Sequence, residues 1–404
     1  MTASARVCLC MSAAVFRRLV FCLPFVTVLI WGARAHGQAN GIYADFTTSM
    51  GSFTCRLEYA IAPKAVANFI GLATGQRPWL DLNTGLARTN PFYNGITFHR
   101  VITNFVIQAG SPNAQGTDGP GYVVPDEIKT ALRFNSPHML AMANSGTNSN
   151  GSQFFITVSS QPSLNDGYTI FGQLVGGTNT VLNINHVAVD ANSKPLTNIY
   201  IQSVGIRRVG PAAQAFDINT NNLPGVTNLP IQIANVSTQV SLAFNNRLYA
   251  DNRIYSSTNL TTWSGENLGI EIAAPTTNSF RKTMDAPARF YSVAQIQYPS
   301  TTSSPKNVLG RKVTMNFSGG SGTIVVNFDS NGGGTYTYTL GSPGTITSYT
   351  WFQEPYRGRL WPISYSALVD MTLTLNFTSA TSGTLNGTAY TFPPSAVSGT
   401  FTLN

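Results

Sequence analysis

An arginine and a glutamine stand within an otherwise apolar stretch, FHRVITNFVIQAGSP, at residues 98–112. Arg100 and Gln108 are separated there by Val, Ile and Phe side chains. A guanidinium and a carboxamide donate hydrogen bonds but do not act as nucleophiles. Such groups can bind and polarise an amide, so they suit a reaction in which no covalent bond to the enzyme forms.

The sequence lacks the motifs of metal, haem and phosphate-binding sites and of one common class of serine nucleophile. The chain has 4 histidines, no two of them close in sequence, and 4 cysteines, of which Cys8, Cys10 and Cys22 lie near the N-terminus. The ligand spacings of zinc and haem sites are therefore absent. The Asn- and Gly-rich stretch NSGTNSNGSQ lacks the lysine of a phosphate-binding loop, and no G-x-S-x-G occurs. We expect neither a metal nor a cofactor.

The N-terminus has the features of a signal peptide. Arg17 and Arg18 precede LVFCLPFVTVLIWGA, an apolar run of about 15 residues, and small residues follow in ARAHGQA. The run is short for a membrane span, which needs about 20 residues. We therefore expect residues 1–39 to be removed, an exported protein in the periplasm or outside the cell, and no stable membrane span afterwards.

Charge and composition limit the kinds of partner and the class of protein to be expected. Without the four arginines of the signal segment, the formal net charge falls from +8 to +4, and no dense basic run with interleaved aromatics is present. Nucleic acid is therefore an unexpected partner. Only 10% of the 404 residues are charged, which favours an exported, β-rich protein, and the length predicts two or three domains.

Residues 40–209 read as the unit that must position Arg100 and Gln108. SFTCRLE alternates, with Cys55 on its apolar face, which predicts a half-buried strand and an inert core thiol. PKAVANFIGLATG begins with Pro63 and ends with Gly75, as a helix does. NTVLNINHV predicts a second helix. Six further apolar runs predict strands: TFHRVI, FVIQA, HMLAMA, QFFITV, YTIFGQLV and IYIQSVGI.

The rest of the chain is predicted to be strand and turn. Residues 210–225 are rich in Pro and Asn and read as a linker, followed by a β-rich module over 226–300. A second linker, STTSSPK, precedes residues 307–404. Their alternating runs, such as KVTMNF and DMTLTLNF, predict an antiparallel sandwich or barrel.

Three segments resemble the cyclophilin-type peptidyl-prolyl isomerases, particularly bacterial ones. They are FYNGITFHRVITNFVIQAGSP, GPGYVVPDE and LAMANSGTNSNGSQFFITVSSQPSLNDGYTIFGQLVGG, in family order and spacing. The resemblance covers Gly41 to Arg208. It implies an eight-stranded antiparallel barrel capped by two helices, and catalysis of rotation about X–Pro peptide bonds of polypeptides. The uncatalysed barrier to that rotation is ~18–20 kcal/mol.

The resemblance also implies roles for individual residues. Arg100 falls on the catalytic arginine, and Gln108 on the glutamine that orients this arginine and the substrate. Phe105 matches the floor of the proline pocket, and His99 matches a histidine that we interpret as a structural support. Further substrate-binding positions are Val106, where methionine is usual; Phe155 and Leu164 in the pocket walls; Ala143, Asn144 and Gln153 along the substrate backbone; and Tyr168, where eukaryotic members often have histidine.

Two features depart from the family pattern. Ser163 stands where eukaryotic members have a tryptophan associated with tight binding of cyclosporin, which implies weak inhibition by that cyclic peptide. The segment ATGQRPWLDLNTGLARTNP is longer than in the shortest bacterial forms and is expected to form a surface loop near the pocket.

Three functions compete at this point. The first is an exported prolyl isomerase that assists folding. The second is a module that binds Pro-containing segments, as a chaperone does, without turnover. The third gives the main task to the β-rich tail, as an anchor to a surface, a glycan or another protein. The set of Arg100, Phe105 and Gln108 favours the first.

Overall fold

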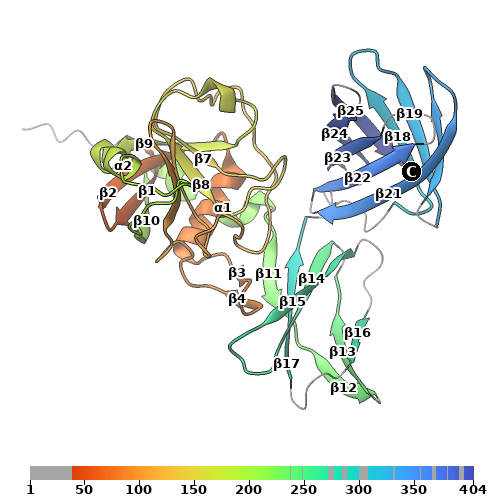
Figure 1. Cartoon of the computed structure of the whole chain (residues 1–404). Coiled ribbons are helices and arrows are strands. Elements are labelled where there is room, and N and C mark those ends of the chain that lie inside the picture. The colour runs from red at the N-terminus through yellow and green to blue at the C-terminus, as the bar shows by residue number, and fades with distance from the viewer. Residues whose placement is uncertain are drawn as a thin grey trace, which may run out of the picture. The chain divides into compact units, whose positions relative to one another are not determined.

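The alternating apolar segments in the first half of the chain form one antiparallel sheet in a computed structural model of the protein (Figure 1). The structure describes residues 39–404, apart from positions 237, 248, 272–276, 284–288, 300–307, 331–332, 355, 366–369, 380 and 391–394. The predicted signal peptide, residues 1–39, lies outside the described residues except for its last position. Residues 40–404 form one compact unit.

The N-terminal domain, residues 40–209, is built on an eight-stranded sheet with the strand order β10-β1-β2-β9-β7-β8-β6-β5. Thr97, just before β5, bridges Tyr200, just before β10, so the two end strands of the sheet meet. The sheet therefore curls around a core in which Phe46 and Phe53 stack at 4.5 Å. The strands are β1 (Gly41–Thr48), β2 (Gly51–Leu57), β5 (Phe98–Ile102), β6 (Val106–Ala109), β7 (Met139–Met142), β8 (Phe154–Thr157), β9 (Ile170–Gly176) and β10 (Ile201–Val209).

The strand predicted from SFTCRLE has the expected faces. Phe53, Cys55 and Leu57 of β2 are buried in the core, whereas Arg56 between them is exposed. Burial also raises the pKa of the Cys55 thiol far above its ordinary value, with a further contribution from the charge of Asp45. The prediction of a buried core thiol is confirmed.

Two helices cover the sheet, as the sequence predicts. Helix α1 (Pro63–Thr74) has proline in its first turn, where no backbone N–H is needed, and ends at Gly75 with a left-handed φ of 72°. Helix α2 is Thr178–Asn185. Helix α1 packs against β9 and β10, and α2 packs against β2, β5 and β6 (Figure 1).

The long segment after α1 is more than the surface loop expected from the sequence. It contains a hairpin of β3 (Trp79–Asp81) and β4 (Leu86–Arg88). Its turn is held by Asp81, whose carboxylate accepts hydrogen bonds from the Asn83 backbone at 3.0 Å and the Thr84 hydroxyl at 2.8 Å. Leu80 is fully buried, so this hairpin packs against other parts of the protein.

Residues 210–225, where the sequence predicts a linker, carry short helices that pack on the N-terminal domain. They are α3 (Pro211–Ala215) and the 3-10 helix η2 (Ile218–Asn221). Ala213 and Ile218 belong to the same buried cluster as the sheet and α1. The core of the N-terminal domain therefore extends beyond residue 209.

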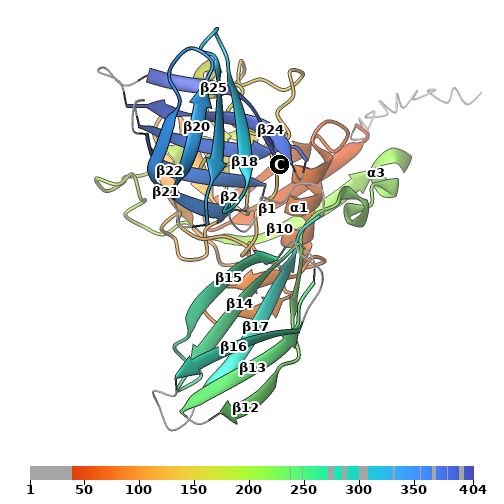
Figure 2. The same ribbon diagram turned by 90° about the vertical axis from the view of Figure 1, so that its right-hand side faces the viewer.

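The middle module, residues 225–299, is a sandwich of two antiparallel sheets (Figure 2). The sheets have the orders β11-β17-β14-β15 and β12-β13-β16. Val240 and Leu242 from one sheet meet Ile254 and Val293 from the other in a shared core. The strands are β11 (Gly225–Asn228), β12 (Gln232–Val236), β13 (Gln239–Asn245), β14 (Ala250–Ser257), β15 (Ser264–Glu271), β16 (Thr277–Thr283) and β17 (Phe290–Gln297).

The C-terminal residues 308–404 form a closed barrel in which the first strand pairs with the last. The alternating apolar residues, such as Val313 and Met315, fill its interior, and the intervening Thr and Asn side chains face out. The strands are β18 (Lys312–Phe317), β19 (Thr323–Phe328), β20 (Gly334–Tyr338), β21 (Gly344–Glu354), β22 (Arg357–Tyr365), β23 (Met371–Phe377), β24 (Ser382–Ala389) and β25 (Ser395–Leu403). The mainly β fold predicted from the sequence is confirmed.

Candidate active site

The polar residues of the opening motif lie in a row across three neighbouring strands. Arg100 of β5 is paired with Gln108 of β6, and Gln108 is paired with Phe155 of β8. Because side chains alternate along a strand, the intervening Val101 and Ile107 point to the other face and are fully buried in the core. The strands thus place one row of functional side chains on the outer face of the sheet.

A chain of hydrogen bonds fixes the orientation of Arg100. The side-chain amide of Gln153 donates to the backbone carbonyls of Gly116 and Asp118, both at 2.9 Å. Its oxygen accepts from the Gln108 amide at 3.1 Å, and the Gln108 oxygen accepts from the Arg100 guanidinium at 3.3 Å. Since carbonyls only accept, they determine the orientation of both amides, which leaves the Gln108 oxygen facing Arg100.

Arg100 forms no ion pair with a carboxylate of the described residues. A guanidinium has five N–H donors in a planar fork, and the contact with Gln108 uses only part of that capacity. The remaining donors can bind a carbonyl or an amide nitrogen of a substrate placed beside the ring of Phe105, which lines the same cavity.

Phe105 stands on a turn that is held by α2. The Asn185 side chain accepts a hydrogen bond from the Asn104 backbone at 2.8 Å and donates to the Ile102 carbonyl at 2.9 Å. Asn104 itself has a φ of 60°, which asparagine tolerates better than most residues. The fully buried Asn185 therefore fixes the turn that places the half-buried Phe105 at the cavity.

Aromatic side chains build the apolar side of the site. The Phe155 ring stacks on Phe134 at a centroid distance of 5.9 Å, and Tyr168 meets it edge-on at 5.3 Å. Leu164 belongs to the short 3-10 helix η1 (Pro162–Leu164) and packs on the same cluster. Ser163, the departure from the family pattern, is exposed beside it.

These elements enclose a cavity of about 210 Å³, which we call the proline pocket. It brings together nine of the residues predicted from the sequence and combines one cationic group with an apolar wall. The lining residues are Arg100, Phe105, Val106, Gln108, Ala143, Asn144, Phe155, Leu164 and Tyr168.

The remaining two predicted residues lie outside that cavity. Gln153 lines a neighbouring cavity and acts on Arg100 through Gln108. His99 is 7% exposed, and neither of its ring nitrogens has a hydrogen-bond partner among the described residues. Burial, together with the positive charges of Arg100 and Lys194, lowers the pKa of His99 to about 4. The ring is therefore neutral near pH 7 and cannot supply a proton there.

The Asn144 side chain lines the pocket and also forms two hydrogen bonds with neighbouring loops. Its amide donates to the Gly167 carbonyl at 2.9 Å, and its oxygen accepts from the Gly146 backbone at 3.2 Å. The backbone N–H of Ala143 donates to the Gln153 carbonyl at 2.9 Å. This edge of the pocket is thereby tied to Gln153, just before β8, and to the loop that carries Tyr168.

Sequence reasoning missed the residues that support the site. Phe134, in a loop with no clear pattern, stacks on Phe155, and Asn185 lies in a helix far away in sequence. The carbonyls of Gly116 and Asp118 leave no signal in side-chain types. A buried asparagine within the apolar helix pattern is the one clue that the sequence offers, because such a side chain needs partners.

No group of His, Cys, Asp and Glu among the described residues is arranged to hold a metal ion. No helix in the described ranges combines the length and the apolar character that a membrane crossing requires.

Comparisons with known proteins agree with the geometry. The family model "Cyclophilin type peptidyl-prolyl cis-trans isomerase/CLD" matches residues 43–206. The chain is 44% identical over 170 residues to peptidyl-prolyl cis-trans isomerase B of Streptomyces anulatus, covering 41% of this chain and 97% of that protein. It is 43% identical over 165 residues to peptidyl-prolyl cis-trans isomerase A of Mycobacterium tuberculosis, covering 40% of this chain and 91% of that protein.

A solved cyclophilin-type isomerase of Cryptosporidium parvum is 31% identical, with a TM-score of 0.37, and the match covers 42% of this chain and 99% of that one. The sequence matches all fall on the domain that carries the proline pocket. Through this domain, the chain belongs to the family of cyclophilin-type peptidyl-prolyl cis-trans isomerases.

Proposed function

We propose that the N-terminal domain catalyses X–Pro rotation without covalent chemistry and that Arg100 is its catalytic residue. The proline ring binds against Phe105 and Phe155, in the apolar part of the pocket. The guanidinium of Arg100 lies at the same cavity and is held there by Gln108. This pairing of a fixed cation with an apolar pocket is the observation that carries the proposal.

The physical basis is the loss of amide resonance in the transition state. As the X–Pro bond twists, the nitrogen lone pair is no longer delocalised and the nitrogen becomes pyramidal. An N–H donor held beside the proline, binding its carbonyl and the developing lone pair, interacts more strongly with the twisted state than with either planar isomer. Because the side-chain amides of Gln153 and Gln108 already hold Arg100 in place, the guanidinium needs little reorientation during the reaction.

The direct test is exchange between cis and trans forms of a short Pro-containing peptide, followed by NMR with the chain from residue 40 to 404. Isomerase activity requires faster exchange at substoichiometric protein. Binding of the peptide with an unchanged exchange rate would instead support the binding module. Absence of both would refute the assignment of the pocket.

We further propose that the substrates are exported polypeptides and that the protein itself is exported. This proposal is supported by Arg17 and Arg18, the apolar run after them and the small residues up to Ala39. Fractionation of cells that express the full chain tests it, with N-terminal sequencing of the recovered protein. Recovery of uncleaved protein in the cytoplasm alone would contradict it.

A further inference from the structure

One buried cluster contains side chains from all three domains of the chain. Its residues contact one another away from water, so the domains meet in a packed contact. The members that matter here are Leu80 and Tyr122 of the N-terminal domain, Tyr255 and Tyr298 of the middle module, and Tyr356 of the C-terminal barrel.

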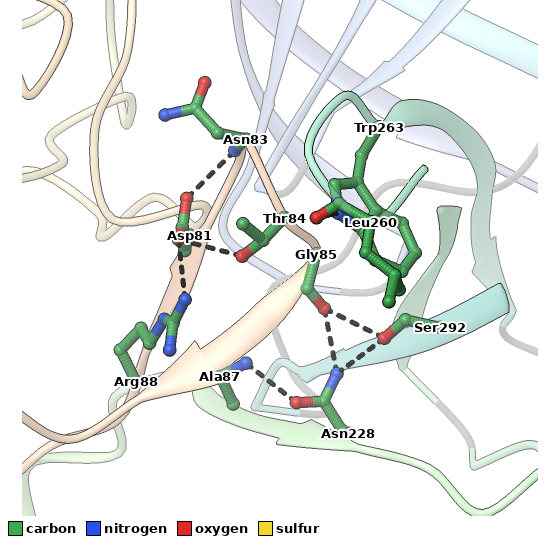
Figure 3. Close-up of polar contacts among 10 residues, drawn as sticks. All are labelled: Asp81, Asn83, Thr84, Gly85, Ala87, Arg88, Asn228, Leu260, Trp263 and Ser292. Carbon is green, nitrogen blue, oxygen red and sulfur yellow. Dashed lines mark hydrogen bonds and ion pairs between the residues drawn. The ribbon is translucent and has the colours of Figure 1, made fainter. Parts of the chain in front are cut away.

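Polar contacts fix the middle module to the N-terminal domain at the β3–β4 hairpin (Figure 3). The Asn228 oxygen accepts a hydrogen bond from the Ala87 backbone at 2.8 Å, and its amide donates to the Gly85 carbonyl at 2.9 Å. The Ser292 hydroxyl donates to the same carbonyl at 3.2 Å. One carboxamide therefore satisfies both a donor and an acceptor of the hairpin backbone, which holds the middle module against this domain.

The C-terminal barrel joins the cluster through the turn between β21 and β22. Tyr356 is 1% exposed, and its ring meets the ring of Tyr298 edge-on at a centroid distance of 5.6 Å. Its φ of 63° is uncommon for tyrosine and persists only where the surrounding structure holds it. The ring does not belong to the buried cluster that fills the barrel. Tyr356 therefore stabilises the contact between domains and not the barrel interior.

The next residue, Arg357, contacts the loop 144–150 of the N-terminal domain. Its guanidinium donates a hydrogen bond to the Thr147 carbonyl at 3.1 Å, although the residue is only 7% exposed. A Cβ built on Gly146 would lie 2.7 Å from a nitrogen of the same guanidinium. A buried arginine thus spends part of its hydrogen-bonding capacity on the backbone of another domain.

Asp126 holds the same loop from within the N-terminal domain. Its carboxylate accepts hydrogen bonds from the Asn148 backbone at 2.8 Å and from the Asn150 side chain at 2.7 Å. Burial raises the pKa of this carboxyl, whereas the two hydrogen bonds and the charge of Arg357 oppose that rise. The cation of the barrel therefore favours the ionised carboxylate that both asparagines use as an acceptor.

The loop 144–150 forms one edge of the proline pocket. Asn144, its first residue, lines the pocket, and its side-chain oxygen accepts a hydrogen bond from the Gly146 backbone at 3.2 Å. Gly146 is bonded directly to Thr147, whose carbonyl binds Arg357. A displacement of residues 146 and 147 therefore also displaces the side chain that lines the pocket.

We propose that Arg357 is a positioning residue for substrate binding, through which the C-terminal barrel holds Asn144 at the edge of the proline pocket. The inference rests on the proposed isomerase function and extends it to the barrel. Arg100 is oriented separately, through Gln108. Arg357 therefore affects binding of the planar and the twisted peptide equally, so its loss should raise KM and leave kcat nearly unchanged.

The test uses the chain from residue 40 to 404 and a short alanine peptide that contains a single proline, called the all-alanine peptide. NMR exchange over a range of peptide concentrations gives kcat and KM. Arg357→Met keeps the length of the side chain but removes its charge and its donors. We expect KM to rise roughly three- to tenfold at an unchanged kcat.

Two further variants accompany this measurement. Arg357→Lys retains a charged donor within reach of the Thr147 carbonyl and should restore most of the affinity. Lys312→Met is the matched control, because it removes the positive charge of an exposed barrel residue and should leave KM unaltered.

Tyr356→Asn loosens the same contact without changing Arg357. Asparagine tolerates a φ of 63° well, so the turn keeps its backbone conformation, whereas the packing against Tyr298 is lost. KM should rise in this variant too. Amide hydrogen exchange, followed by mass spectrometry, adds a readout that is independent of turnover. The loop 144–150 should exchange faster in Arg357→Met and Tyr356→Asn, whereas β18 of the barrel should exchange as in the unaltered protein.

The outcomes separate the two proposals. No turnover of the all-alanine peptide by the unaltered protein would refute the isomerase function itself. Normal turnover, with KM and exchange of the loop 144–150 unchanged in the folded variants, would refute the role of Arg357 alone. A rise in KM that Lys312→Met shares would also refute that role, because the effect would then come from net charge.

Discussion

At the scale of the residue, the site depends on amides whose orientation is determined by the backbone. Gln153 carries no group that reaches the proline pocket, yet it lies between two fixed carbonyls and Gln108. Removing it frees Gln108 to rotate, and Arg100 then loses the partner that holds it. A positioning residue of this kind affects the chemical step more than substrate binding.

Gln153→Leu, which keeps the volume but not the hydrogen bonds, is expected to lower kcat on the order of tenfold, about 1.4 kcal/mol, with little change in KM. The matched control is Gln115→Leu, an exposed position on the neighbouring loop. Isomerisation kinetics of the two variants check the prediction. An equal loss in both, or a change in KM alone, would show that Gln153 does not position Arg100.

His99 predicts how stability responds to pH. Its pKa of about 4 in the folded protein lies below its ordinary value near 6.5, because burial and the charge of Arg100 disfavour the protonated ring. Between these values the unfolded chain binds more protons than the folded one. The contribution of neutral His99 to the free energy of unfolding is therefore fully present above pH 6.5, and it is lost as the pH falls toward 4.

Urea unfolding at pH 7.5 and pH 5 measures this effect for the unaltered chain and for His99→Phe. The free energy of unfolding should fall less between the two pH values in the variant. His138, whose pKa burial also lowers, contributes to the slope in both proteins and cancels in the comparison. Identical slopes would show that His99 does not become protonated on unfolding in this range.

At the scale of the element, the strand and helix predictions succeed where a local pattern determines the structure. Pro63 and Gly75 mark both ends of α1, and the alternation around Cys55 matches the faces of β2. The sequence pattern predicts the C-terminal strands equally well, but it does not distinguish a sandwich from a barrel. That distinction depends on pairing between β18 and β25, which lie far apart in sequence and carry no local signal.

The prediction for the segment after α1 was incomplete for a related reason. The β3–β4 hairpin is short and gains its burial from the middle module, so its own pattern resembles a surface loop. The pocket residues themselves could be placed because the family resemblance covers them. The loop carbonyls, Phe134 and Asn185, which support them, are set by tertiary contacts that no single segment reveals.

The face assignment of β2 leads to a chemical prediction. Cys55 is fully buried and its pKa is raised, so little thiolate exists near neutral pH. A thiol reagent should not label the native chain from residue 40 to 404 within minutes but should label it rapidly in denaturant. Mass spectrometry of the labelled protein gives the result. Fast native labelling would mean that the strand opens readily or faces solvent.

At the scale of the whole molecule, the buried cluster of the N-terminal domain includes residues that follow position 209. Ile218 and Ala213 insert into its core, and Leu223 packs at the edge of the same cluster. A fragment ending at residue 210 lacks these side chains, whereas one ending at residue 224 keeps them. Loss of a buried isoleucine typically costs about 2–5 kcal/mol.

The fragment 40–224 should therefore be more stable than 40–210 by about that amount, as measured by urea unfolding. Both contain every residue that lines the proline pocket, so the folded fraction of each should isomerise the all-alanine peptide. Equal stability of the two fragments would show that α3 and η2 are dispensable to the core.

The proposed role of Arg100 is to stabilise the twisted X–Pro bond, and its replacement by alanine tests this role. In the chain from residue 40 to 404, kcat/KM for a short Pro-containing peptide is measured by NMR exchange for the unaltered protein and for Arg100→Ala, with folding verified by circular dichroism. We expect a loss of roughly 100- to 1,000-fold, or about 3–4 kcal/mol, expressed mainly in kcat. A folded Arg100→Ala protein with unaltered turnover would contradict it.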